Sequence, residues 1–140
     1  MINVAIAEDQ AGLREAFVRL INNFHRMTVT ITAVDGIDLL DQLAAAEVLP
    51  DVLLLDINMP RMDGVEASSV MRERFASVRV VVFTSWGGDD FRVKRMMENG
   101  CVGYLEKDAL PGRVEEVLRE SVATGSVGER AVKRANGIRE

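Results

Sequence analysis

The stretch VLLLDINMPRMDG, residues 52–64, decides the fold. Its first four residues are apolar without a break, which is typical of a strand buried on both faces of a parallel sheet. The acid Asp56 follows at once, and the segment after it is rich in turn formers and ends in Asp63 and Gly64. A helical pattern begins at Val65. The stretch therefore predicts a central strand, a loop and a helix, in that order.

The alternation of strand and helix extends from this unit toward both ends of the chain. Short β-branched runs predict strands at 2–7, 27–34, 52–55, 78–83 and 103–106. Segments with apolar residues three and four apart predict helices at 11–23, 38–46, 65–75, 89–99 and 113–123. Right-handed crossovers and this chain length favour an open, doubly wound sheet over a closed barrel of about eight units. The expected fold is α/β and flavodoxin-like: a (βα)5 arrangement whose parallel strands have the order 2-1-3-4-5.

Composition narrows the class of protein. The chain has 140 residues, a net charge of −5 and one cysteine, Cys101, so we expect one core, no internal disulfide and no general attraction to nucleic acid or anionic lipid. The first apolar run reaches Glu8 and Asp9 too early for a signal peptide, and no later run approaches membrane-spanning length. We therefore expect a cytoplasmic protein. Residues 1–124 are predicted to form one domain, and residues 125–140 a linker or tail. Two alternatives stay open for that segment: it leads toward an output domain that the sequence does not include, or it ends a natural single-domain protein.

Polar side chains follow four of the five predicted strands, at the point where each strand ends. They are, in chain order, Glu8, Asp9, Asp56, Thr84, Ser85 and Lys107. In open α/β sheets, ligands bind outside the carboxyl ends of the strands, and all of these residues lie at that edge. Acids, hydroxyl groups and an ammonium group are therefore expected to converge in one site.

Three carboxylates at one edge repel each other unless positive charge lies among them. Lys107 supplies one such charge, and Mg²⁺ suits a site made of carboxylate oxygens, water and phosphate. A carboxylate beside a metal ion, an ammonium group and a hydroxyl group is equipped to attack phosphorus. Asp56 is the best candidate for the nucleophile because it ends the most buried strand. Mg²⁺, Lys107 and the Thr84 hydroxyl can then each stabilise an oxygen of the transferred group.

Together these residues resemble the receiver domain of bacterial two-component response regulators, over roughly residues 1–124. The segments that match in type and order are Glu8-Asp9, LLLDINMPRMDG at 53–64, Thr84-Ser85 and Tyr104-Leu105-Glu106-Lys107. The resemblance implies a signalling switch that takes a phosphoryl group from a sensor histidine kinase, rather than an enzyme that turns over a substrate. Carried over by position, it makes Asp56 the phosphoacceptor. Glu8 and Asp9 become the acidic pair that binds Mg²⁺ with Asp56 and the backbone carbonyl of Asn58.

The resemblance also assigns the residues that report phosphorylation. Thr84 is implied as the hydroxyl switch residue, Tyr104 as the aromatic residue that turns inward on activation, and Lys107 as the partner of the phosphoryl group. Trp86 departs from the pattern, because it is a bulky residue at a position that should flank the phosphoryl group. We expect Trp86 and Asn58 to limit the approach of water and so lengthen the life of the phosphorylated state. An unchanged dephosphorylation rate in Trp86→Ala would contradict this.

A finer resemblance concerns the output of the switch. The run Gly103-Tyr104-Leu105 followed by Lys107-Asp108-Ala109 looks like the subgroup of receivers that precede a LuxR-type helix-turn-helix domain. This subgroup implies control of transcription, with DNA contacted only through the output domain. The surface of residues 89–120 is then expected to change on phosphorylation and to control dimerisation or output.

Three alternatives are weighed against a receiver. A phosphohydrolase with an aspartyl nucleophile usually has an acid two residues later, where this chain has Asn58. A nucleotide or flavin binder is disfavoured because neither GxGxxG nor GxxxxGK[ST] follows a predicted strand. The main alternative is a phosphate-independent module of receiver type that only binds other proteins.

Two simpler interpretations concern helix 89–99. Val93, Met96 and Met97 are predicted to face the core. The basic residues Arg92, Lys94 and Arg95 are balanced by nearby acids and are predicted to form a solvent-exposed charged face.

Overall fold

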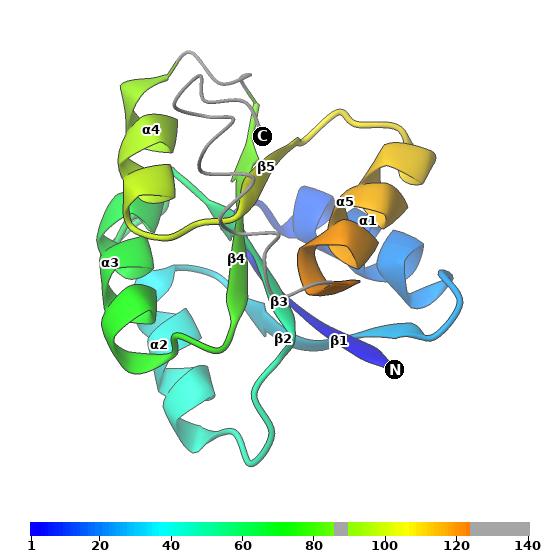
Figure 1. Cartoon of the computed structure of the whole chain (residues 1–140), viewed down its shortest axis with the longest axis horizontal. Helices are drawn as coiled ribbons and strands as arrows, with labels where there is room; N and C mark the ends of the chain where they lie inside the picture. Colours follow the sequence, from blue (N-terminus) through cyan, green and yellow to red (C-terminus); the bar gives the residue numbers. More distant parts are fainter. Residues whose placement is uncertain (86–89, 124–140) are drawn as a thin grey trace.

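A five-stranded parallel sheet runs through the middle of the molecule, as Figure 1 shows. The computed structural model of the chain describes residues 1–85 and 90–123. Its strands are β1 (Ile2–Ala7), β2 (Met27–Ala33), β3 (Val52–Asp56), β4 (Arg79–Thr84) and β5 (Gly103–Glu106). They lie in the order β2-β1-β3-β4-β5, and every neighbouring pair is parallel. The predicted flavodoxin-like topology is confirmed. Trp86 and the predicted tail 125–140 lie outside the described residues.

Helices cover both faces of the sheet (Figure 1). They are α1 (Ala11–Asn22), α2 (Gly36–Ala45), α3 (Gly64–Arg74), α4 (Phe91–Glu98) and α5 (Pro111–Ala123). Helices α2, α3 and α4 lie on one face, whereas α1 and α5 lie on the other. Because each helix returns the chain to the amino edge of the sheet before the next parallel strand begins, the carboxyl ends of all the strands meet at the opposite edge.

The middle of the sheet is apolar, as the uninterrupted run at residues 52–55 predicts. Every residue of β3 is buried, and so are the last four of β1. Helix α1 packs on the sheet partly through Phe17, whose ring meets that of Phe83 on β4 edge to face with centroids 4.7 Å apart. Each such side chain contributes about 1.5–3 kcal/mol when it is fully buried. The core therefore holds the ends of β1, β3 and β4 in fixed positions.

The starts of α2 and α3 differ from the predicted ones because capping side chains set them. Helix α2 begins at Gly36 instead of residue 38, since the Asp35 carboxylate accepts a hydrogen bond from the Asp38 amide. In the same way, Asp63 precedes α3 and accepts from the Glu66 amide. The periodicity of apolar residues marks the buried face of a helix and not its first residue, so it misses these positions by a residue or two.

The loop from β3 to α3 returns tightly onto the end of β3. The Gly64 amide donates to the Ile57 carbonyl at 2.7 Å. A Cβ atom at Gly64 would lie 2.1 Å from the Asp56 carbonyl oxygen. Glycine is therefore required here for a close approach of two backbone segments. This approach fixes the direction in which the chain leaves Asp56.

The same loop is tied to the start of α2. Arg61 donates to both oxygens of Asp35, from Nε at 2.7 Å and from Nη2 at 3.0 Å. The Gly36 amide donates to the Met62 carbonyl at 3.1 Å. Arg61 has a φ of 63°, in the left-handed region that side chains rarely adopt. Its ion pair with the buried Asp35 carboxylate holds it in this conformation.

This ion pair predicts how stability depends on pH. The Arg61 guanidinium lowers the pKa of Asp35 below its ordinary value of 3.8, and the hydrogen bond from the Asp38 amide adds to this. The folded state thus gains stability that is present above pH 3.8 and is lost as the pH falls through the lowered pKa. Asp35→Asn keeps a good helix cap but removes the charge. In urea unfolding the wild type should be more stable than Asp35→Asn at pH 7, and the difference should shrink toward pH ~3. An equal difference at both pH values would contradict the role of the charge.

Candidate functional site

The carboxyl edge of the sheet holds a polar cavity of about 250 Å³. It lies where β3 and β4 end and where the chain leaves β1 and β5. The residues that line it are Asp9, Gln10, Asp56, Ile57, Asn58, Thr84, Ser85, Asp90, Arg92 and Lys107. Most of the polar residues predicted from the strand ends are therefore brought together around one cavity.

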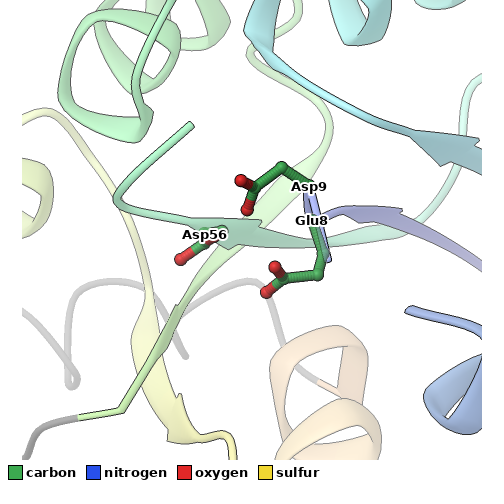
Figure 2. Close-up of side chains that lie close together, drawn as sticks. All are labelled: Glu8, Asp9 and Asp56. Carbon is green, nitrogen blue, oxygen red and sulfur yellow. The ribbon is translucent and has the colours of Figure 1, made fainter. Parts of the chain in front are cut away.

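Three carboxylates gather at this edge. Glu8 and Asp9 follow β1, and Asp56 is the last residue of β3. Figure 2 shows their side chains close together at the ends of the two neighbouring strands. One oxygen from each can be chosen so that all three lie within 4.8 Å of one another. Glu8 and Asp56 are buried, with exposed fractions of 0% and 3%, whereas Asp9 is exposed.

Lys107 joins the two buried acids. Its Nζ atom lies 2.7 Å from Glu8 Oε1 and 3.0 Å from Asp56 Oδ1. It also lies 5.5 Å from the centre of the Phe83 ring, which adds a cation–π contact. The backbone amide of Lys107 donates to the Thr84 carbonyl at 2.8 Å, which positions the lysine beside the end of β4. Burial lowers the pKa of Lys107, but the two ion pairs outweigh this and raise it.

One ammonium group does not balance these acids. Burial raises the pKa of Asp56 from 3.8 to about 6, and the nearby Glu8 charge adds to the rise while Lys107 opposes it. Glu8 Oε2 accepts a hydrogen bond from the Gln10 amide at 3.0 Å. Glu8 Oε1 is fully buried and contacts Lys107 as an ion pair, but it receives no hydrogen bond of favourable geometry from the part of the chain that the structure describes. The site thus carries excess negative charge and an oxygen atom that is not fully satisfied.

These donors fit a hard divalent cation. Carboxylate oxygens on adjacent strands, one of them exposed to solvent, are ligands that Mg²⁺ prefers, with water completing its shell. A cation there would also offset the repulsion that burial imposes on Asp56. The residues present therefore fit a metal ion at Glu8, Asp9 and Asp56.

Thr84 and Tyr104, the two predicted switch residues, differ in their position relative to the cavity. Thr84 lines the cavity and is buried at the end of β4. Tyr104 lies apart from the lining residues, in β5, with 40% of its surface exposed. Met96, Met97 and Val93 are buried as predicted.

Arg92 and Asp90 are the residues that the sequence interpretation missed. Lys94 and Arg95 are exposed as predicted, but Arg92 lines the cavity. It donates from Nη1 to Asn58 Oδ1 and from Nη2 to Asp90 Oδ2. The prediction that Arg92 belongs to a solvent-exposed face was therefore wrong in part. A capping acid just before the helix that follows β4 was the available signal, because it places the first turn of that helix at the carboxyl edge.

The fold and this acidic edge define an α/β domain of the doubly wound class, in which ligands bind outside the carboxyl ends of the strands. Comparison with known proteins then gives the family. Residues 4–119 match the response regulator receiver domain, so the chain belongs to this family. Its members are components of two-component signal transduction rather than classical enzymes. The acidic cluster of Glu8, Asp9 and Asp56 lies within the residues that match this family.

Individual relatives support this membership. The chain is 36% identical over 139 residues to the uncharacterized transcriptional regulatory protein YxjL of Bacillus subtilis, covering 99% of this chain and 62% of that protein. The receiver domain of the response regulator NarL from Mycobacterium tuberculosis is 30% identical, with a TM-score of 0.76 over 86% of this chain and 95% of that one. A LuxR-family DNA-binding response regulator from Staphylococcus aureus is 25% identical, with a TM-score of 0.78 over 86% of this chain and 98% of that one.

The chain spans about half to two thirds of the length of the curated relatives it matches. Among the helices of residues 1–85 and 90–123, none has the length and apolar character needed to cross a membrane.

The raised pKa of Asp56 predicts a gain in stability when its charge is removed. The folded state holds this proton more tightly than the unfolded chain, so ionisation costs stability as the pH rises from 3.8 toward about 6. Asp56→Asn should therefore unfold at higher urea concentration than the wild type in metal-free buffer at pH 7, by roughly 1–3 kcal/mol. The gain should shrink as the pH falls toward about 3, below both pKa values, where Asp56 is mostly protonated in the folded and in the unfolded state. A variant that is less stable at pH 7 would contradict the proposed charge imbalance.

Proposed function

We propose that this chain is a phosphorylation-activated switch that accepts a phosphoryl group from a sensor histidine kinase on Asp56, with Mg²⁺ as cofactor. The observation that carries the proposal is the position of Asp56. It ends the fully buried strand β3, opens onto the 250 Å³ cavity and lies 3.0 Å from the Lys107 ammonium group. A buried carboxylate beside an ammonium group and two further acids is well placed to act as the nucleophile in phosphoryl transfer.

Each residue around Asp56 has a distinct role in this proposal. An Asp56 carboxylate oxygen forms the new bond to phosphorus while the bond from phosphorus to the donor breaks, and the donor leaves with that electron pair. Lys107 is positioned to neutralise one phosphoryl oxygen, and the Thr84 hydroxyl to donate to another. Mg²⁺, held by Glu8, Asp9, Asp56 and the backbone carbonyl of Asn58, would supply the remaining positive charge when bound.

In this proposal, the charge that phosphorylation adds at Asp56 changes the conformation of nearby residues. The new group adds nearly two negative charges and three acceptor oxygens beside Thr84. We infer that Thr84 moves toward it and that Tyr104, now 40% exposed on β5, turns inward into the space that Thr84 leaves. A shift from mostly inactive to mostly active needs about 5.5 kcal/mol of differential binding, which a few desolvated charge-assisted contacts can supply.

The output of the switch extends beyond the described residues. We propose that the surface of α4, β5 and α5 reports phosphorylation and controls dimerisation or an output domain. Support comes from relatives that are named transcriptional regulatory proteins and are longer than this chain. In this proposal residues 1–124 form the receiver, residues 125–140 lead toward an output domain that alone contacts DNA, and the protein acts in the cytoplasm. Asn58 and Trp86 would tune the lifetime of the aspartyl phosphate.

Intact-mass spectrometry with a small phosphodonor tests this proposal. The wild type, incubated with acetyl phosphate and Mg²⁺, should gain one phosphoryl group that hydroxylamine removes, because an aspartyl phosphate is an acyl phosphate. The adduct should be absent in Asp56→Asn and strongly reduced when Mg²⁺ is chelated.

Asp51→Asn is a matched control, since Asp51 stands before β3 at the opposite end of the strand and its carboxylate accepts only a structural hydrogen bond from the Asn3 amide within the described residues. This variant should be phosphorylated like the wild type. A wild type that gains no adduct would overturn the switch and favour a phosphate-independent binding module.

A further inference from the structure

Arg92 is a second cation at the cavity, held in place by an acid of its own helix. Asp90 caps α4 by accepting from the Arg92 amide at 2.8 Å. The same carboxylate binds the guanidinium group, from Nη2 at 2.7 Å and from Nε at 3.2 Å. A two-point contact of this kind fixes the plane of the group as well as its position. Asp90 therefore aims the remaining edge of Arg92 at the cavity.

That remaining edge contacts the loop that carries the phosphoacceptor. Arg92 Nη1 donates to the side-chain oxygen of Asn58, two residues after Asp56. Arginine has five N–H groups, and three are engaged with Asp90 and Asn58 within the described residues, which leaves two for an oxyanion. The Asn58 amide is neutral, so a charged phosphoryl oxygen would compete well for Nη1.

The charges around the cavity indicate that Lys107 alone does not attract an anionic phosphodonor. Lys107 is already committed to Glu8 and Asp56. The cavity is lined by three acids and only two basic residues, so an approaching phosphodonor meets net negative charge. The acids are Asp9, Asp56 and Asp90, and the basic residues are Lys107 and Arg92. The Arg92 side chain is 36% exposed, whereas that of Lys107 is 17% exposed. Arg92 is thus the more accessible of these two cations to a donor arriving from solvent.

We propose that Arg92 is a phosphodonor-binding residue, whose guanidinium group, oriented by Asp90, binds the anionic phosphoryl group as it enters and keeps contact with it on Asp56. This inference rests on the proposed function of Asp56 and adds a residue to its binding site. The contact with Asn58 is the resting position of the guanidinium group, and a phosphoryl oxygen replaces the Asn58 amide oxygen.

Phosphorylation rates measured over a range of acetyl phosphate concentrations, with Mg²⁺ present, test the proposal in the full chain. Arg92→Ala should lower the rate per donor concentration roughly tenfold, because a charge-assisted contact to the donor is lost. Arg92→Lys keeps the charge but loses the planar guanidinium group, so its phosphorylation rate should lie between those of the wild type and Arg92→Ala. Arg95→Ala is the matched control, since it removes the same side chain from an exposed position of the same helix. It should stay within about twofold of the wild type, as expected for a screened surface charge.

Equilibrium binding of beryllofluoride, a mimic of the phosphoryl group, provides a second readout by calorimetry in the presence of Mg²⁺. Arg92→Ala should bind it roughly tenfold more weakly than Arg95→Ala does, while both variants unfold at similar temperatures. Equal rates and affinities for these two variants would overturn the role of Arg92 and leave Asp56 as the acceptor. Faster phosphorylation of Arg92→Ala would overturn it as well, since Arg92 would then obstruct the site. A wild type that takes no phosphoryl group would overturn the proposed function and this inference together.

Discussion

The ion pairs of Lys107 with Glu8 and Asp56 connect β5 to β1 and β3 across the end of β4. Both acids are almost fully buried, so each would be costly without a partner. One lysine meets only part of this cost, which is why burial and the neighbouring Glu8 still raise the pKa of Asp56 to about 6. The arrangement is therefore stable enough to form and still leaves negative charge that no cation among the described residues balances. That remaining imbalance connects the fold to the proposed chemistry.

The rest of the structure divides into a fixed part and an adjustable part around this charge cluster. The loop after Asp56 is fixed, because Gly64 permits a close backbone approach and Asp35 holds Arg61 at the start of α2. The first turn of α4 lies opposite and reaches the same loop through Arg92, whose side chain is partly exposed. A new negative charge on Asp56 would thus act on a rigid acceptor loop and on a cation that can change partner.

The sequence predicts the topology and most of the cavity because both depend on where strands end. The uninterrupted apolar run at 52–55 identifies a central strand, and parallel strands place Glu8, Asp56 and Lys107 at one edge. The position of Arg92 was not predictable in this way, since it depends on a helix start set by Asp90 and on the direction of a long side chain. The starts of α2 and α3 were missed for the same reason: capping contacts join residues that no periodic pattern relates. The roles assigned to the site residues remain predictions.

The most direct test of the central claim is a Mg²⁺ titration followed by amide NMR shifts of the wild type and Asp9→Asn. If excess negative charge at the carboxyl edge attracts the cation, the first and largest shifts should come from residues 8–10 and 56–58 as Mg²⁺ is added. Asp9→Asn should need roughly tenfold more Mg²⁺ for the same shifts, because one carboxylate ligand is lost. Shifts that are absent, or that spread over the acidic surface and match in both proteins, would contradict a metal site at this edge.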